Sequence, residues 1–221
     1  MIKQFNVYKL LSIAKYLQDH IESSPDDKSY MKLIKLIFFT DRYHIRNNGV
    51  LSTFDIYDAL PYGPIASKSK NLLLKDFDWL SGCSDEETDF IEKHVKVDTL
   101  SKNVILTNIV DYDYLSRSNI IAMDFACEHF KKFGRFEIAN LTHDYPEWGR
   151  FKDLFVARQT QQEVINMDDF FKNINIAETE YMKNHFEEDP FKEDEEFLND
   201  MCQEYHKINK FESIHSNLTY C

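Results

Sequence analysis

The sequence predicts a mainly α-helical, compact domain that carries a small β-ribbon and continues into an acidic, helical C-terminal extension. Three observations predict this fold class. Apolar residues recur at helical spacing in several segments, one short segment is rich in β-branched residues, and acidic residues gather toward the C-terminus. With 43% hydrophobic and 14% aromatic residues among 221, the chain has ample apolar surface for a globular core.

Two helices are predicted in the first fifty residues. The first spans residues 3–22, because its apolar residues fall at three- and four-residue steps and share one face. Either Asp27 or Ser29 can cap the second helix, which extends to about residue 46 and is apolar around most of its circumference. A helix of that kind is usually central. Residues 47–49, Asn-Asn-Gly, end it because they tolerate a left-handed backbone.

The segment after Gly49 is acidic and aromatic and leads into a corner. Residues 50–57 fit either a short strand or a helix, because their periodicity favours neither. Gly63 allows a tight bend before Pro64. Pro64 suits the first position of a third helix, which we expect to extend to about residue 75.

The middle of the chain is predicted to form a β-ribbon, preceded by a capped helix start and followed by two helices. Ser84 begins a segment typical of a capped helix start, although residues 90–97 fit helix or strand equally. Residues 104–110 are β-rich and are expected to pair with residues 92–97. The next helix starts at Leu115-Ser116 and ends at Gly134, and a shorter one spans residues 136–141.

We expect the chain to divide into a domain at residues 1–155 and an extension at residues 156–221, with residues 157–166 as a linker. Between residues 168 and 200 the acidic side chains far outnumber the basic ones, yet aromatic residues are retained. This composition indicates acidic amphipathic helices that pack on another surface, in contrast to a solvated tail.

Composition excludes several classes of protein. A formal net charge of −12 argues against nucleic acid as the main partner and favours a basic protein surface. The longest apolar run is far shorter than the ~20 residues of a membrane span, and the N-terminus lacks the features of a signal peptide, so we expect a cytoplasmic protein with no membrane contact. Four widely separated cysteines are expected to stay reduced.

Enzyme signatures and cofactor sites are not visible in the sequence. With only five glycines the chain has no nucleotide-binding loop, and GxSxG is also absent, so we predict neither an enzyme nor a cofactor. His143, Asp144 and Glu147 could ligate a metal, but they lack HxxxH or HExxH spacing, so a turn held by hydrogen bonds is preferred. Cys202 with His206 and His215 matches no tetrahedral zinc pattern.

A group of carboxylates and aromatic side chains precedes the Gly63-Pro64 bend. Asp55 and Asp58 could be a pair for acid–base chemistry, although among 38 acidic residues such a pair is expected by chance on a solvated face. Tyr57 and Tyr62 lie beside them. Aromatic residues supply contact area and carboxylates select basic partners, so a recognition surface and simple packing are both open interpretations.

Six sequence motifs occur in an order typical of a known family. They are KLIKLIFF at residues 32–39, Gly49, YDALPYGP at 57–64, LS at 115–116, FG at 133–134, and LTH at 141–143 with PEW at 146–148. In this order and spacing, over about residues 5–152, the chain resembles the SocA-like, or Panacea-domain, antitoxins of bacterial and phage toxin–antitoxin systems. Three departures are Leu60 in place of a frequent Trp, Ile65 in place of Val, and Glu147 between Pro146 and Trp148.

The resemblance implies a mainly helical domain that neutralises a cognate toxin protein, encoded by an adjacent gene, through direct contact. It also implies a possible link to regulated proteolysis, because one branch of the family looks like a protease adaptor. Alternatives are a metal-assisted hydrolase using His143, Asp144 and Glu147, and an acidic phage-type inhibitor that binds a basic surface. The residues predicted to contact the partner are Asp55, Tyr57, Asp58, Tyr62, Gly63, Pro64, His143, Trp148, Glu193, Glu195 and Glu196.

Overall fold

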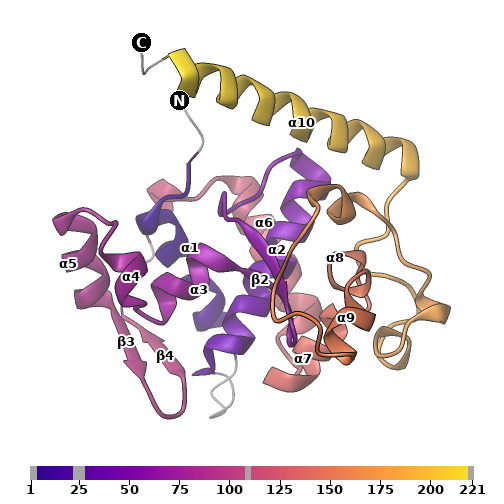
Figure 1. Cartoon of the computed structure of the whole chain (residues 1–221), viewed down its shortest axis with the longest axis horizontal. Coiled ribbons are helices and arrows are strands. Elements are labelled where there is room, and N and C mark those ends of the chain that lie inside the picture. Colours follow the sequence, from indigo (N-terminus) through magenta and orange to yellow (C-terminus); the bar gives the residue numbers. More distant parts are fainter. Residues whose placement is uncertain (1–3, 22–27, 108–110, 219–221) are drawn as a thin grey trace.

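Helix α2 (Tyr30–Asn48) lies at the centre of the protein, with the other elements arranged around it (Figure 1). The structure is a computed structural model that describes residues 4–21, 28–107 and 111–218, with side chains up to residue 210. Ser29 caps α2 by accepting a hydrogen bond from the backbone N–H of Met31, at 3.2 Å. Gly49, with φ of 65°, ends it. The predicted central helix is therefore confirmed, and the alternative cap Asp27 lies outside the described residues.

Three amphipathic helices pack against α2. They are α1 (Val7–His20), α6 (Arg117–Phe130) and α7 (Arg135–Thr142). Helix α6 begins with a capping box in which Ser116 and Asn119 each bond the other's backbone N–H. All three helices were predicted, because each has an apolar face that local spacing reveals. The predicted ends of the first helix, at residues 3 and 22, fall outside the described residues.

A β-hairpin follows α2. Strand β1 (Tyr57–Leu60) pairs antiparallel with β2 (Gly63–Ala66), and the short strand β5 (Glu163–Val164) pairs with the other edge of β1. The prediction that Pro64 starts a helix is wrong. Pro64 lies in β2, an outer strand that tolerates a residue without an N–H, and α3 (Ser67–Leu73) begins only at residue 67.

Residues 76–114 form a lobe of short elements. Helices α4 (Phe77–Leu80) and α5 (Asp85–His94) precede an antiparallel ribbon of β3 (Val95–Asp98) and β4 (Asn103–Leu106). The ribbon and the capped start at Ser84 are as predicted, and the ambiguous segment is a helix that passes directly into a strand. Residues 108–110 of the predicted strand lie outside the described residues, and a 3-10 helix, η2 (Tyr112–Tyr114), follows them.

The chain after α7 is mostly irregular until the last helix. Short helices α8 (Pro146–Gly149) and α9 (Lys152–Val156) lead through β5 into three 3-10 helices, η3 (Met167–Phe171), η4 (Ile176–Glu178) and η5 (Met182–Asn184). Helix α10 (Glu195–Leu218) then runs along the top of the molecule in Figure 1. The amphipathic helices predicted between residues 168 and 194 are thus replaced by short 3-10 helices and irregular segments, and α10 is the long helix of this C-terminal part.

Residues 163–194, which we call the strap, pack into the same core as the helices. Phe170 and Met182 are fully buried, and Phe191 is 3% exposed. The ring of Phe170 lies 5.7 Å from that of Phe38, and the ring of Phe191 lies 5.8 Å from that of Phe39. The strap therefore completes the hydrophobic core around α2. Among the described residues, no helix combines the length and the apolar composition that a membrane span requires.

Candidate functional site

Two of the sequence motifs meet in space, at what we call the corner: the turn of the β1–β2 hairpin together with the end of α7 and the start of α8. Gly63 has φ of 99°, and a Cβ atom there would overlap the hydroxyl of Thr142 and lie 2.6 Å from Nζ of Lys35. The ammonium group of Lys35 donates to the carbonyl oxygen of Pro64 at 2.7 Å. Only glycine fits this approach, which explains the YGP sequence.

Trp148 fixes the hairpin from the other side. Its indole N–H donates to the carbonyl oxygen of Leu60 at 2.7 Å, and its ring stacks on His143 with a centroid distance of 3.7 Å. Trp148 itself is 4% exposed, whereas Tyr62 at the hairpin tip is 61% exposed. The corner therefore presents one exposed aromatic side chain on a rigid base.

Burial controls the charge state of the corner. Burial lowers the pKa of Lys35 well below its usual value. Burial, with the nearby Lys35 charge as a smaller cause, also lowers the pKa of His143 to about 4. The Nε2 atom of His143 has no hydrogen-bond partner among the described residues. At neutral pH, His143 is consequently a neutral ring packed against Trp148.

The other residues predicted to contact a partner at this corner are buried, which corrects the expectation of an exposed acidic surface. The Asp55 carboxylate accepts hydrogen bonds from the backbone N–H groups of Lys68 and Ser69, at 2.8 and 2.7 Å, and so caps α3. Tyr57 donates its hydroxyl proton to Asp41 at 2.8 Å. Asp58, Gly63 and Pro64 are buried as well. The polar groups of Asp55 and Tyr57 stabilise the fold, because they form hydrogen bonds with neighbouring elements.

The three potential metal ligands His143, Asp144 and Glu147 do not converge. The Asp144 carboxylate accepts hydrogen bonds from three successive backbone N–H groups of the strap, at residues 180–182, over 2.7 to 2.9 Å. Glu147 is fully buried and paired with Arg42, and His143 stacks on Trp148. Each side chain thus has a separate structural partner, and the geometry does not favour the hydrolase alternative.

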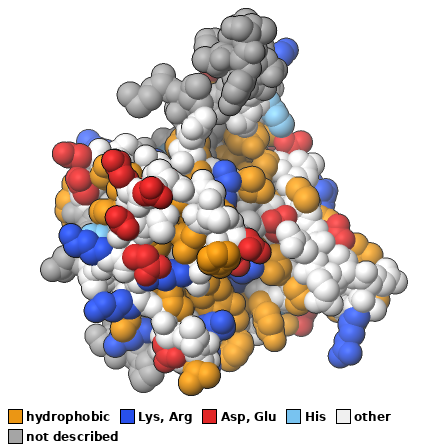
Figure 2. Space-filling model, turned by 60° about the vertical axis from the view of Figure 1, so that its left-hand side comes forward, with side chains coloured by type: hydrophobic (Ala, Val, Ile, Leu, Met, Phe, Trp, Pro, Cys, Tyr) orange, Lys and Arg blue, Asp and Glu red, His pale blue; other side chains and the backbone are white. Residues whose placement is uncertain are grey.

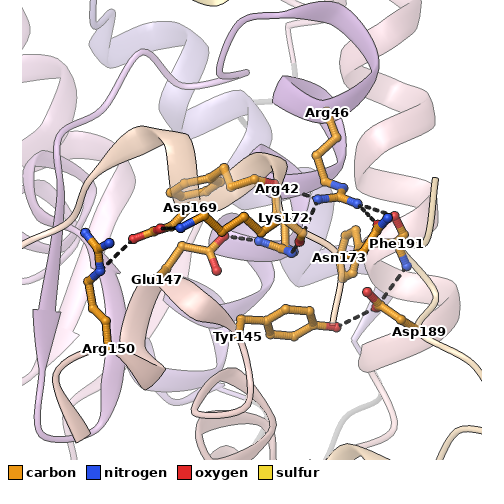
Figure 3. A network of polar contacts seen from close by, with 11 residues as sticks. Arg42, Arg46, Tyr145, Glu147, Arg150, Asp169, Lys172, Asn173, Asp189 and Phe191 are labelled. Atoms are coloured by element: carbon orange, nitrogen blue, oxygen red, sulfur yellow. Dashed lines mark hydrogen bonds and ion pairs between the residues drawn. The ribbon is translucent and has the colours of Figure 1, made fainter. Parts of the chain in front are cut away.

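A buried arginine pair, Arg42 and Arg46, holds the strap against α2 and was not among the predicted site residues (Figure 3). Both guanidinium groups are buried. Arg46 donates to the carbonyl oxygens of Phe170, Lys172 and Phe191, at 2.8 to 3.0 Å, and to the side chain of Asn173 at 2.6 Å. Arg42 donates to the carbonyl oxygen of Lys172 at 2.9 Å and to the carboxylate of Glu147.

Further polar contacts extend this network along the strap. Asp169 is 0% exposed and pairs with Arg150 at 3.1 Å and with Lys172 at 2.6 Å. Tyr145 donates to Asp189 at 3.2 Å, and the Arg42 guanidinium lies 4.3 Å from the Tyr145 ring centroid. One sequence signal could have indicated the network. Two arginines four residues apart, in a central helix that is apolar around most of its circumference, must find buried acceptors.

The acidic residues predicted to contact a partner near the C-terminus are exposed. Glu193, Glu195 and Glu196 all lie at the surface where the strap meets α10. Glu193 and Glu195 line a concave region of about 750 Å³. Its other lining residues are His129, Asn173, Phe186, Glu188, Asp189, Pro190, Lys192 and Asp194. We call this region the acidic concavity; five of its ten residues are carboxylates, so it is suited to a basic segment of a partner.

Comparison with known families gives one match. The family model described as "Antitoxin SocA-like, Panacea domain" matches residues 33–149, which is more than half of the 221-residue chain. The matched region includes most of α2, the β1–β2 hairpin and the α7–α8 turn, so it contains the whole corner. The strap and α10 lie beyond it. No curated protein and no solved structure matches the chain significantly.

Proposed function

The chain belongs to the Panacea-domain family of SocA-like antitoxins, and from this premise we propose that it neutralises a cognate toxin by direct protein–protein binding. The family match over residues 33–149 is the observation that carries the proposal. One property of the described residues supports a binding role, because an acidic concavity lies open at the surface.

The proposed partner is a basic toxin encoded by an adjacent gene. The chain has a net charge of −12, and long-range attraction between opposite charges raises the rate at which two such proteins meet. On the face shown in Figure 2, acidic side chains lie among exposed hydrophobic ones, whereas five of the ten residues that line the acidic concavity are carboxylates. We infer that the concavity receives a basic segment of the toxin and that Tyr62 adds an aromatic contact elsewhere.

Co-expression with the product of the neighbouring gene tests the proposal. We expect that product alone to arrest growth, the present chain to restore growth, and the two proteins to co-elute as one complex. If growth recovers while the purified proteins do not associate, direct binding is refuted although the antitoxin role survives. If the neighbouring product is harmless, or growth does not recover, the antitoxin assignment itself loses its support.

Neutralising three carboxylates tests the contact surface. The variant carries Glu193→Gln, Glu195→Gln and Glu196→Gln. It keeps Asp194, because that carboxylate caps α10 by accepting from the backbone N–H groups of Glu196 and Phe197 at 2.9 and 3.1 Å. We expect toxin binding to weaken by roughly ten-fold or more at low salt, and the loss to shrink as salt screens the charges.

A matched control removes three exposed carboxylates elsewhere, through Asp89→Asn, Asp113→Asn and Asp153→Asn. Both triple variants lose the same net charge, so a difference between them reports the position of the charges. The melting temperatures of both proteins should stay close to that of the wild type. Equal dissociation constants for the two variants, measured by calorimetry at low salt, would rule out the acidic concavity as the contact surface.

A further inference from the structure

A cluster of potential metal ligands lies away from the corner, where α10 packs on the strap. Asp168 belongs to η3, and Cys202 and His206 belong to α10. One carboxylate oxygen of Asp168 lies 3.7 Å from Sγ of Cys202 and 2.7 Å from Nε2 of His206. The three ligand atoms lie within 4.8 Å of one another, the one such group of three or more found among the described residues.

Packing on both sides sets the positions of these ligands. Cys202 and His206 are four residues apart, so they project from the same face of α10. That helix is anchored by Leu198, which is 2% exposed, and by Tyr205, whose ring lies 6.0 Å from that of Phe171. Phe171 belongs to η3, the element that carries Asp168. The two elements therefore hold the ligands together without any help from a metal.

We propose that Asp168, Cys202 and His206 bind a zinc ion that clamps α10 onto the strap. The ligand set selects the metal, because Mg²⁺ and Ca²⁺ prefer oxygen ligands throughout, whereas Zn²⁺ accepts sulfur, nitrogen and oxygen together. Three protein ligands leave the fourth tetrahedral position to solvent or to a side chain of a bound protein.

Binding of the ion requires the ligand atoms to shift, and the Cys202 and His206 ligand atoms, which lie within 4.8 Å of each other, have to settle at about 3.6 Å. In a tetrahedral zinc site with ordinary bond lengths, the ligand atoms lie about 3.3–3.6 Å apart. The 3.7 Å between Cys202 Sγ and Asp168 Oδ1 is close to this range. The His206 nitrogen must move away from Asp168 by roughly 0.6 Å. The side chains of His206 and Asp168 are 58% and 45% exposed, so both are free to make this adjustment.

The sequence alone could not predict this set of ligands. Cys202 and His206 fit no zinc pattern together with His215, whose side chain lies outside the described part of the protein. The third ligand comes instead from Asp168, 34 residues before Cys202. Folding of the strap is what brings it to α10.

Cobalt binding to the full-length chain, purified without an affinity tag and under reducing conditions, tests the proposal. Cobalt(II) is a spectroscopic substitute for zinc, and a cysteine ligand gives it a thiolate-to-metal charge-transfer band. We expect the band to saturate at one equivalent of cobalt and to disappear when zinc is added. Absence of the band, or saturation well above one equivalent, would overturn the proposal.

Three variants locate the site. Cys202→Ser should abolish the charge-transfer band, and His206→Ala, at an exposed position, should weaken cobalt binding by roughly ten-fold or more. Cys83→Ser is the matched control, because Cys83 is a partly buried free thiol elsewhere in the fold; it should leave the band unchanged. A band that persists in Cys202→Ser would place the thiolate ligand at another cysteine and refute the assignment.

Amide hydrogen exchange tests whether the ion acts as a clamp. If opening of α10 breaks the site, then zinc at ten times its dissociation constant should slow exchange of amides in residues 199–206 by roughly ten-fold. Exchange in α5, which is remote in sequence and carries none of the ligands, should not change. Equal exchange of residues 199–206 with and without zinc would show that the ion does not hold α10 in place.

Discussion

Gly63 occupies a position that only glycine can fill, which gives a prediction at the scale of one residue. We expect Gly63→Ala to lower the free energy of unfolding by about 1–3 kcal/mol, because the added Cβ meets Thr142 and Lys35 at a backbone φ of 99°. Urea denaturation measures the change. Gly134→Ala is the matched control, since φ there is −65° and an added Cβ would meet no neighbouring atom within 4 Å. If both variants are equally stable, the close approach at the corner is not a constraint.

His143 gives a second prediction, about pH. Its pKa in the folded protein is lowered to about 4 by burial, compared with 6.5 for an exposed histidine. Between these values only the unfolded state binds the proton, so stability must rise as pH rises from about 4 to 6.5. The full effect is about 3 kcal/mol. Above pH 6.5, His143 is neutral in both the folded and the unfolded state, so its protonation no longer destabilises the folded protein.

The variant His143→Phe isolates this contribution. Phenylalanine can keep the ring stack on Trp148 but cannot bind a proton. We expect the difference in unfolding free energy, variant minus wild type, to shrink steadily as pH rises from 4 to 6.5 in matched denaturation experiments. Other groups that titrate in this range cancel in the difference. Parallel pH profiles for the two proteins would mean that His143 is protonated equally in the folded and unfolded states.

At the scale of elements, local signals predicted the helices well. The caps Ser29 and Ser116 and the terminator Gly49 act on backbone groups a few residues away, so a short window of sequence contains both partners. The apolar face of each long helix is likewise visible in its spacing. The β3–β4 ribbon could be predicted for the same reason, because its two strands are separated by a short turn.

Elements whose partners are distant in sequence could not be predicted in this way. Helix α3 begins at residue 67 and not at Pro64, because its cap is the carboxylate of Asp55, twelve residues before it. The same carboxylate therefore became buried, although its charge suggested an exposed surface. In the strap, Arg46 occupies backbone carbonyl groups of Phe170 and Phe191 that a helix would have needed for its own hydrogen bonds.

At the scale of the whole molecule, the strap and α2 depend on each other. Without the strap, Arg46 would lose the acceptors at Phe170, Lys172, Asn173 and Phe191, and Arg42 would keep only its pair with Glu147. A buried charge without partners is strongly destabilising. The strap, with few backbone hydrogen bonds of its own, is held in turn by those arginines and by its buried aromatic rings. The motifs of residues 1–155 were sufficient to identify the family, but they do not contain all the contacts that the core requires.

A truncated chain tests this dependence. We expect residues 1–155 alone to fail to fold cooperatively, because removal of the strap exposes the core at Phe38 and Phe39 and leaves Arg42 and Arg46 without their carbonyl acceptors. Residues 1–206, which keep the strap and the anchored turns of α10, should unfold in one cooperative transition near the wild-type temperature. Circular dichroism during heating distinguishes the two. A cooperative transition for residues 1–155 would instead establish the independent domain that the composition of the sequence predicts.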